Sequence, residues 1–233
     1  MNKDYKERYN RQIILDDITE TGQIALSKAK ILIVGMGGLG CPISLYLSAA
    51  GIGEISFIDD DIVSLSNLQR QILFNTNEIG KPKVEIALNK LKALNPNVKF
   101  TAIKGKLDKS NAEDIISKYD YILDACDNFQ TRYLIDDICN KNKTTYIYTS
   151  ISNYKGQIAI FDYKNDFSFT NLFPKDDNLI EEKPNGVIGV LPGIMGLMAA
   201  NELVKIICNY GENLLNKLLV YNSKDNEYNI LNF

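Results

Sequence analysis

Short apolar runs alternate with segments of helical periodicity along most of this chain. The apolar runs predict strands at 31–34, 55–59, 98–103, 121–124, 144–149 and 157–162. Between two of them, apolar residues recur at helical spacing at positions Val84, Ala87, Leu88, Leu91 and Leu94. Strands that alternate with helices are typical of a parallel sheet with helices on both faces, so we expect a doubly wound α/β fold.

The end of the chain has a different pattern. A helix is expected at 193–208, ending before Gly211, a residue type suited to a helix C-cap. Two strand-like runs follow at 218–221 and 228–231, and we expect them to pair antiparallel at one edge of the sheet. The predicted fold is therefore a Rossmann-like, mostly parallel sheet with an antiparallel C-terminal edge, in a single domain spanning 1–233.

A glycine-rich loop follows the first predicted strand. Gly35, Gly37, Gly38 and Gly40 lie between that strand and a helical pattern at 39–50, and the free N–H groups at the start of such a helix face bound phosphates. Asp59 ends the next predicted strand and suits the ribose hydroxyls. These features alone are typical of NAD or FAD binding, so a dinucleotide-binding oxidoreductase remains an alternative.

Two basic residues, Arg70 and Lys83, come soon after the predicted ribose-binding strand. Hydride transfer has no need of cations there, whereas a reaction at ATP phosphates needs positive charge where negative charge develops. A solvated surface position is the alternative for each residue. Their place after the glycine loop and Asp59 favours ATP.

Composition narrows the class of protein. The chain has 233 residues, of which 45% are hydrophobic and 24% charged, as in a globular domain with a sizeable core. A formal net charge of -3 makes nucleic acid an unexpected partner. Residues 1–11 lack the apolar core of a signal peptide, and the longest apolar stretch, 194–208, is interrupted by Glu202 and Lys205 and is too short to span a bilayer. We expect a cytoplasmic protein without a membrane partner.

The catalytic inventory is restricted by the absence of histidine, of which the chain has 0. Mechanisms that use an imidazole base are therefore excluded. Metal sites with histidine, the commonest metal ligand, are excluded as well. The four cysteines, Cys41, Cys126, Cys139 and Cys208, form no CxxC pair and predict neither a zinc site nor a disulfide framework. A reaction in which the substrate supplies its own nucleophile suits this inventory.

Seven blocks of sequence resemble the ThiF/MoeB family, bacterial relatives of the ubiquitin-activating enzymes. They lie at 8–13, 35–40, 59–61, 64–71, 80–83, 123–128 and 186–189. The resemblance implies an ATP-dependent adenylyltransferase that activates the C-terminal glycine of a ubiquitin-like sulfur carrier. Residues 15–18 and 71–74 are closer to the ThiF branch, whose carrier is ThiS of thiamine biosynthesis. The MoeB branch, whose carrier is MoaD of molybdopterin synthesis, is the alternative.

The resemblance also implies roles for individual residues. Asp59 matches the ribose-binding carboxylate and Gly38 the glycine whose backbone meets the phosphates, while the triphosphate contacts match Asn67, Arg70 and Lys83. Asp127 matches a carboxylate beside the phosphates that assists Mg²⁺, although its position also suits a helix N-cap. Asp61 is a candidate for a further site carboxylate, whereas Asp60 and Arg8 are expected to be solvated. Arg11 matches a residue that reaches the ATP of the other subunit in a homodimer.

This resemblance divides the chain into an N-terminal helical segment at 1–28, a nucleotide-binding half at 29–150 and a carrier-binding half at 151–233. The departures from the family fall in the last part. Ser168 to Asn171 stand where family members carry the first CxxC of a structural zinc site, so zinc is not expected. Glu181, Glu182 and Lys183 replace the cysteine that conjugates the carrier.

The polar connection at 164–185 is expected to be either a mobile lid or an ordinary surface loop. The lost cysteines also leave open a degenerate family member that only binds carrier or nucleotide.

Overall fold

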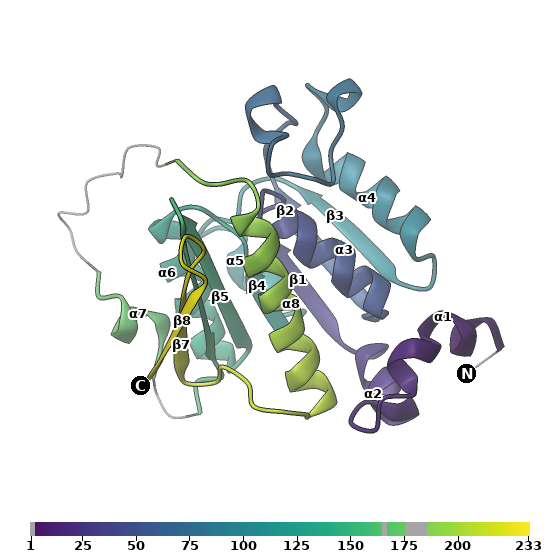
Figure 1. Ribbon diagram of the computed structural model, residues 1–233. Helices are drawn as coiled ribbons and strands as arrows, with labels where there is room; N and C mark the ends of the chain where they lie inside the picture. Colours follow the sequence, from purple (N-terminus) through teal and green to yellow (C-terminus); the bar gives the residue numbers. More distant parts are fainter. Residues whose placement is uncertain (1–2, 165–166, 176–185) are drawn as a thin grey trace.

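The computed structural model describes residues 3–164, 167–175 and 186–233. Within these residues the strands form one mixed sheet in the order β3-β2-β1-β4-β5-β6-β7-β8 (Figure 1). The strands are β1 (Lys30–Val34), β2 (Glu54–Asp59), β3 (Lys99–Lys104), β4 (Tyr121–Asp124), β5 (Thr145–Ser152), β6 (Lys155–Phe161), β7 (Lys217–Asn222) and β8 (Glu227–Asn232).

The helices of the described residues cover both faces of this sheet. They are α1 (Lys3–Ile13), α2 (Thr19–Leu26), α3 (Gly40–Ala50), α4 (Lys83–Leu94), α5 (Ala112–Ile116), α6 (Phe129–Asn142), α7 (Phe169–Leu172) and α8 (Leu191–Cys208), with 3₁₀ turns η1 (Leu65–Asn67) and η2 (Thr76–Glu78). The expected α/β class is confirmed.

The order of the strands reverses at β1. This strand pairs in parallel with β2 on one side and with β4 on the other, and β3 and β5 extend the parallel part outward. Strands β7 and β8 pair antiparallel, as expected for the C-terminal edge. Strand β6 is also antiparallel to β5 and β7, although the run 157–162 was expected among the parallel strands, because the two residues between β5 and β6 are too few for a parallel crossover. In open α/β sheets such a reversal opens a crevice at the carboxyl ends of the strands, where ligands bind.

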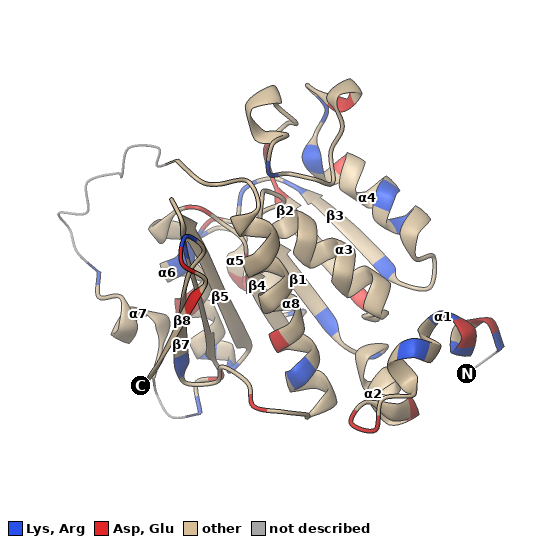
Figure 2. Cartoon of the chain, in the orientation of Figure 1, with Lys and Arg blue, Asp and Glu red and all other residues tan. Residues whose placement is uncertain are grey.

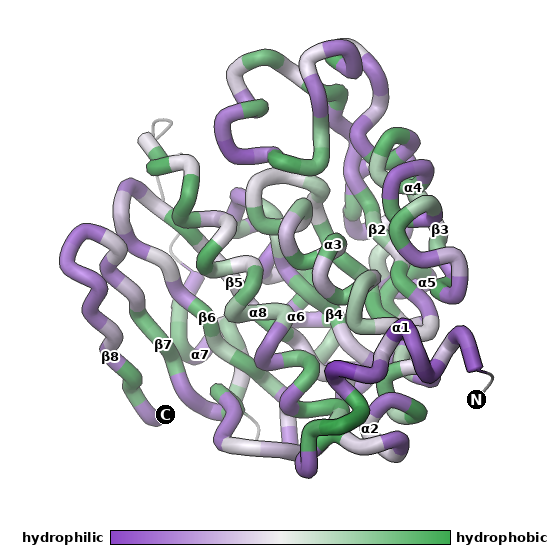
Figure 3. Tube along the Cα trace, turned by 45° about the vertical axis from the view of Figure 1, so that its right-hand side comes forward, coloured by the Kyte–Doolittle hydropathy of each residue, from purple (hydrophilic) through white to green (hydrophobic). Residues whose placement is uncertain are grey.

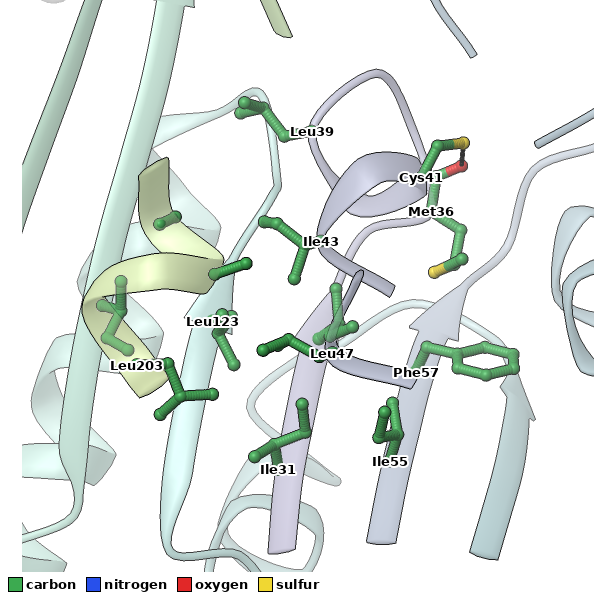
Figure 4. Packing of buried hydrophobic residues seen from close by; sticks show 14 of the residues in the cluster. Ile31, Met36, Leu39, Cys41, Ile43, Leu47, Ile55, Phe57, Leu123 and Leu203 are labelled. Carbon is green, nitrogen blue, oxygen red and sulfur yellow. Dashed lines mark hydrogen bonds between the residues drawn. The ribbon is translucent and has the colours of Figure 1, made fainter. Parts of the chain in front are cut away.

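Alternate residues of β1 enter two separate cores, because successive side chains of a strand point to opposite faces. Ile31 and Ile33 belong to the core under α3, α4 and α8, whereas Leu32 and Val34 belong to the core under α5 and α6. Figure 4 shows the first core, with side chains of α3 lying over those of β1, β2 and β4. The hydrophobic positions are concentrated along the central strands and α8, and the hydrophilic ones along the outer loops (Figure 3).

The N-terminal helices pack beside α3 and α8 rather than on the sheet. Tyr9 of α1 is buried, and its hydroxyl accepts a hydrogen bond of 2.7 Å from the Asn95 side chain. A Cβ atom on Gly51 would lie 2.6 Å from the Tyr9 ring. Glycine is therefore required at the C-terminal end of α3 both for this contact and for its positive φ of 86°.

Helix α8 ends at Cys208 as expected, but its start and its cap residue differ from the expectation. It begins at Leu191 with Pro192 in its first turn, and its C-cap is Asn209 in the left-handed conformation, so the prediction of Gly211 as the cap was wrong. Asparagine is the residue other than glycine that tolerates this conformation best.

The length of α8 also corrects the sequence-based estimate. Its 18 residues are long and apolar enough to cross a membrane by length and composition, although the stretch 194–208 was predicted to be too short. Its contacts are nevertheless those of a core helix, because it packs against α2, α3, β5 and β6.

Candidate functional site

The glycine loop lies at the carboxyl ends of β1, β2 and β4. The N–H of Gly35 donates to the carbonyl of Ile58 at 2.9 Å, and a Cβ atom on Gly35 would lie 2.7 Å from the carbonyl oxygen of Ala125. With φ at 98°, Gly35 satisfies a conformation and a close approach that a larger residue cannot. The loop then opens α3 at Gly40; the N–H of Cys41 donates to the Gly37 carbonyl at 3.1 Å, and Pro42 has no N–H.

Asp59 connects the end of β2 to this loop. Its Oδ2 accepts a hydrogen bond from the N–H of Met36 at 2.7 Å, and its Oδ1 accepts one from the N–H of Asp61 at the same distance. The carboxylate is therefore held beside the glycine loop, with its half-buried side chain at the sheet edge. This position is the one expected of a ribose acceptor.

Arg70 lies beside Gly38 and contacts Asn67; both Arg70 and Asn67 belong to the crossover between β2 and α4. The Nη2 of Arg70 donates to Oδ1 of Asn67 at 3.1 Å, and its Nη1 donates to the carbonyl of Ser66 at 3.3 Å. A Cβ atom on Gly38 would lie 3.4 Å from Cγ of Arg70. The structure thus places this guanidinium side chain next to the phosphate-loop candidate.

Lys83 is the first residue of α4 and is buried, with its side chain 3% exposed. A cation at a helix N-terminus interacts unfavourably with the helix dipole. Asp61 compensates part of this cost, because its Oδ2 lies 2.7 Å from Nζ of Lys83. Because the Lys83 side chain is buried, the solvated surface position given as its alternative is wrong.

Asp127 lies in the turn that follows β4, and its side chain is exposed. The N-cap of α6 is the next residue, Asn128, whose Oδ1 accepts a hydrogen bond from the N–H of Thr131 at 2.9 Å. The alternative of Asp127 as the N-cap was therefore wrong. Because Ala125 of the same turn contacts Gly35, this turn and the glycine loop are neighbours.

The structure does not bring Arg11 to these residues within one chain. Helix α1 packs through Tyr9 against Gly51 at the C-terminal end of α3, whereas the glycine loop precedes the N-terminal end. The 11 residues of α3 separate the two ends by about 16 Å. Arg11 is exposed, on a helix with several basic positions (Figure 2).

Carboxylates suited to a hard cation are present at the same sheet edge. The side chains of Asp59, Asp60 and Asp61 bring oxygen atoms within 4.8 Å of one another. Asp59 accepts two backbone hydrogen bonds and Asp61 pairs with Lys83, whereas Asp127 is exposed and has an Asn128 contact of 3.5 Å. These oxygen donors fit Mg²⁺ held jointly with phosphates, since this ion takes few carboxylates and keeps its waters.

The cysteines are all free and lie in positions that suppress thiol chemistry. Burial raises the pKa of Cys41 to about 12, and burial also raises the pKa of Cys126, Cys139 and Cys208.

Ser168 to Asn171 form a capping box at the start of α7. Of the expected connection at 164–185, residues 165–166 and 176–185 lie outside the described residues, and these include 181–183.

A buried ion pair beside the turn was missed at the sequence level. Asp124 is 0% exposed, and its Oδ2 lies 3.4 Å from Nε of Arg132. Burial lowers the pKa of Arg132, but the neighbouring carboxylate outweighs it and raises the pKa above the ordinary value, so the guanidinium stays charged. The available signal was the position of Arg132 in the first turn of α6, where the helix dipole disfavours a cation.

Comparison with known proteins gives a consistent picture. The family model described as "ThiF family" matches residues 9–233. The chain is 40% identical to a probable molybdopterin-synthase adenylyltransferase of Gracilaria tenuistipitata var. liui, over 95% of this chain and 63% of that protein. It is 37% identical to a sulfur carrier protein adenylyltransferase of Thermus thermophilus, over 95% of this chain and 84% of that protein.

Solved structures agree with the fold. The crystal structure of PaaA has a TM-score of 0.84 at 25% identity, covering 100% of this chain and 74% of that one. The crystal structure of E. coli MccB with ATP has a TM-score of 0.86 at 23% identity, with 100% and 73% covered. The chain spans about three fifths of the length of the algal relative. The family model and the curated relatives together show that this chain belongs to the ThiF family.

Proposed function

We propose that this chain adenylates the C-terminal glycine carboxylate of a ubiquitin-like sulfur carrier protein, using ATP and releasing pyrophosphate. The observation that carries the proposal is the gathering of the glycine loop, Asp59, Arg70 and the Asp127 turn at one reversal of strand order. Its relatives are named as adenylyltransferases, among them one acting on a sulfur carrier protein. This chain shares their family, which supports the same reaction here.

The chemistry requires positioning rather than an ionisable base. A carboxylate oxygen of the carrier attacks the α-phosphorus of ATP, a new O–P bond forms, and the bond to the β-phosphate oxygen breaks as pyrophosphate leaves. The attacking group is already anionic, so the lack of histidine is no obstacle. Arg70 and Lys83 would hold the β- and γ-phosphates, where charge accumulates.

Asp127 would hold Mg²⁺ together with the phosphates, and the ion would neutralise charge on the departing pyrophosphate. Asp59 would bind the ribose hydroxyls, and the backbone of Gly38 would contact the phosphates as the start of α3 faces them. Zinc has no part in this proposal, since the four cysteines form no CxxC pair.

We propose further that the working unit is a homodimer in which Arg11 acts on the ATP of the other subunit. Within one chain, the helix that carries Arg11 packs at the C-terminal end of α3, and the glycine loop precedes the N-terminal end, about 16 Å away along α3. A two-fold axis places the same surface of each subunit against its mate, so one exposed arginine per chain can serve the opposite site. This arrangement resembles an arginine finger supplied in trans.

Two carriers are candidates. The motifs at 15–18 and 71–74 favour ThiS, whereas the algal relatives are named for molybdopterin synthase and favour a MoaD-type carrier. The proposed location is the cytoplasm. An oxidoreductase and a degenerate family member that only binds are the competing classes.

One experiment separates these possibilities. The purified chain is incubated with ATP and Mg²⁺ and with ThiS or MoaD in turn, and the intact carrier is weighed. Addition of one adenylyl group to a carrier identifies both activity and partner. ATP binding without adenylation of either carrier would support the binding-only class, and tighter binding of NAD than of ATP would support the oxidoreductase.

A further inference from the structure

A short segment beyond the candidate site, residues 167–175, is fastened to α6 by one buried carboxylate. Asp136 is 2% exposed, and its two oxygens accept four hydrogen bonds. The donors are the Tyr163 hydroxyl at 2.9 Å, the N–H of Phe169 at 2.9 Å, and the N–H and hydroxyl of Thr170 at 3.0 and 2.7 Å. A buried carboxylate is costly unless its oxygens are satisfied, so this set of contacts fixes α7 in place.

Two phenylalanines of this segment pack on two further rings. The ring centroids of Phe169 and Tyr148 are 5.0 Å apart, and those of Phe173 and Tyr148 are 5.3 Å apart. Both phenylalanines also contact Phe129, at 6.3 and 6.4 Å. The segment therefore holds Tyr148 and Phe129 against the interior.

These same two rings flank the guanidinium of Arg132. Its Cζ atom lies 5.3 Å from the ring centroid of Phe129 and 5.3 Å from that of Tyr148. Aromatic rings stabilise a cation at this distance, more strongly where water is excluded. The Arg132 side chain is 8% exposed, so the packing of Phe169 and Phe173 decides how well the cation is shielded.

Arg132 in turn holds the turn that carries Asp127. Its Nη2 donates to the carbonyl oxygen of Cys126 at 3.0 Å, and its Nε lies 3.4 Å from Asp124. The other oxygen of Asp124 accepts the N–H of Cys126 at 2.9 Å, and Tyr146 donates its hydroxyl to Asp124 at 2.8 Å. Both the N–H and the carbonyl of Cys126 are thereby fixed, immediately before Asp127.

We propose that Asp136 and Arg132 are positioning residues for Asp127. Asp136 holds the 167–175 segment in place, and the phenylalanines of this segment hold the Tyr148 and Phe129 rings against Arg132. Arg132 in turn fixes the Cys126–Asn128 turn. The part of this inference that concerns catalysis rests on the proposed function. The part that concerns the rigidity of the turn does not. A displacement of about 1 Å at a reacting group costs on the order of a hundredfold in rate, so loss of the seating is felt at Asp127 without any direct contact.

The test compares two phenylalanine variants of the same aromatic cluster. Phe173→Leu removes a ring that touches Tyr148 and Phe129, whereas Phe233→Leu removes a ring that packs on Phe161 and Phe167, at 5.6 and 4.4 Å. Both rings are half-buried. Asp136→Asn and Arg132→Lys test the two positioning residues directly, and the lysine keeps the charge while losing the planar fork.

The first readout is hydrogen exchange of peptides covering residues 124–132 in the nucleotide-free protein. We expect exchange there to be about tenfold faster in Phe173→Leu, Asp136→Asn and Arg132→Lys, and unchanged in Phe233→Leu. In the three faster variants the Arg132 guanidinium no longer holds Asp124, the acceptor of the Cys126 N–H, in place. Peptides from α3 serve as the internal reference for general loosening. Equal exchange in Phe173→Leu and Phe233→Leu would overturn the inference. This comparison of the two phenylalanine variants decides the question even if Asp136→Asn fails to fold.

The second readout is carrier-dependent ATP–pyrophosphate exchange. We expect kcat to fall on the order of a hundredfold in the three positioning variants, with KM for ATP changed by less than about threefold. If the three variants show faster hydrogen exchange but the wild type itself has no activity, the proposed function is refuted and the positioning role is left intact. Wild-type kcat in Arg132→Lys and Phe173→Leu, despite an active wild type, would refute the positioning role.

Discussion

The Nζ atom of Lys83 lies 2.7 Å from Oδ2 of Asp61, although the lysine side chain is 3% exposed and the aspartate side chain 67% exposed. The main chains of the two residues are also joined, by a hydrogen bond of 3.0 Å from the N–H of Lys83 to the carbonyl of Asp61. An exposed carboxylate is thus the partner of a buried cation. An arriving phosphate would compete with Asp61 for Lys83.

Replacement of Asp61 by asparagine tests this competition. In Asp61→Asn, Lys83 loses its charged partner, and we expect the free energy of unfolding without nucleotide to fall by about 1–3 kcal/mol. ATP then supplies the missing charge, so the rise in Tm on adding ATP should be larger than in the wild type. Glu85→Gln is the matched control, because it breaks an exposed pair of the same helix, with Lys104 at 3.5 Å. Equal ATP-induced shifts in Asp61→Asn and wild type would refute the competition.

Replacement of Asp127 by asparagine tests the proposed magnesium ligand. Because the side chain is exposed, Asp127→Asn should fold normally. We expect carrier-dependent ATP–pyrophosphate exchange to fall on the order of a thousandfold or more, since several kcal/mol of transition-state stabilisation are lost. The control is Asp114→Asn, an exposed carboxylate of α5 outside the carboxylate cluster at 59–61, whose activity should stay near that of the wild type. Exchange in Asp127→Asn within about tenfold of wild type would remove Asp127 from the proposal.

Subunit mixing tests the trans role of Arg11. Inactive Arg11→Ala and inactive Asp127→Asn proteins are mixed under conditions that allow exchange. A heterodimer then has one site with both lesions and one with neither, so activity should return to about a quarter of the wild-type level. Arg8→Ala should retain activity, because Arg8 is exposed and its Nη1 donates to the Leu94 carbonyl at 3.1 Å. Verified exchange without recovery would place Arg11 at its own chain's site or outside catalysis.

Thiol reactivity tests the cysteine assignments. Burial raises the pKa of Cys41 from 9.0 to about 12, so its thiolate fraction at neutral pH falls roughly a thousandfold. We expect alkylation of all four cysteines to be slow in native protein and fast in urea, with adenylation retained after native treatment. Elemental analysis should find no stoichiometric zinc. A carrier thioester trapped on any of these cysteines, or one zinc per chain, would contradict this prediction.

A pH-dependent contribution to stability comes from Glu78. Its Oε2 accepts hydrogen bonds from Lys90 Nζ and from the N–H of Asn75, both at 2.7 Å. Burial raises the pKa of Glu78, but these two donors outweigh it, and the folded-state pKa lies below the ordinary 4.5. The folded state therefore gains stability above pH 4.5 and loses it as the pH falls through the folded-state pKa.

The measurement for Glu78 is urea unfolding of Glu78→Gln at pH 7 and at an acidic pH. We expect the variant to be less stable by about 1–2 kcal/mol at pH 7, and the gap from wild type to shrink in acid, where Glu78 itself is protonated. A gap of the same size at both pH values would mean that the charge of Glu78 contributes nothing.

The strands and the glycine loop were predictable from the sequence because their signals are local. Apolar runs and an adjacent turn define β1 and the loop up to Gly40, and the structure has both within a residue of the expected bounds. The cap of α8 was missed for the opposite reason. Asn209 already adopts the left-handed conformation that ends the helix, so Gly211 has no helix left to cap.

The only local sign of the ion pair between Asp124 and Arg132 was an arginine in the first turn of a helix, where the helix dipole disfavours a cation. Its rationale lies in rings from β5 and α7, which meet only after the sheet has formed. Arg11 could not be assigned from its own surroundings either, because the site proposed for it belongs to another chain. The identity of the carrier depends on a partner surface and is likewise absent from local sequence patterns.

The pairing of β1 with β4 has a consequence for how the protein is made. The hydrogen bond from the N–H of Lys30 to Asp120 joins residues separated by 90 positions. A growing chain that has released β1 and β2 therefore presents an unpaired strand edge until β4 emerges from the ribosome. The contact between Gly35 and Ala125 forms only at that stage. Truncated chains that end before β4 should consequently aggregate and bind no nucleotide, so the emergence of β4 is the point at which synthesis becomes productive.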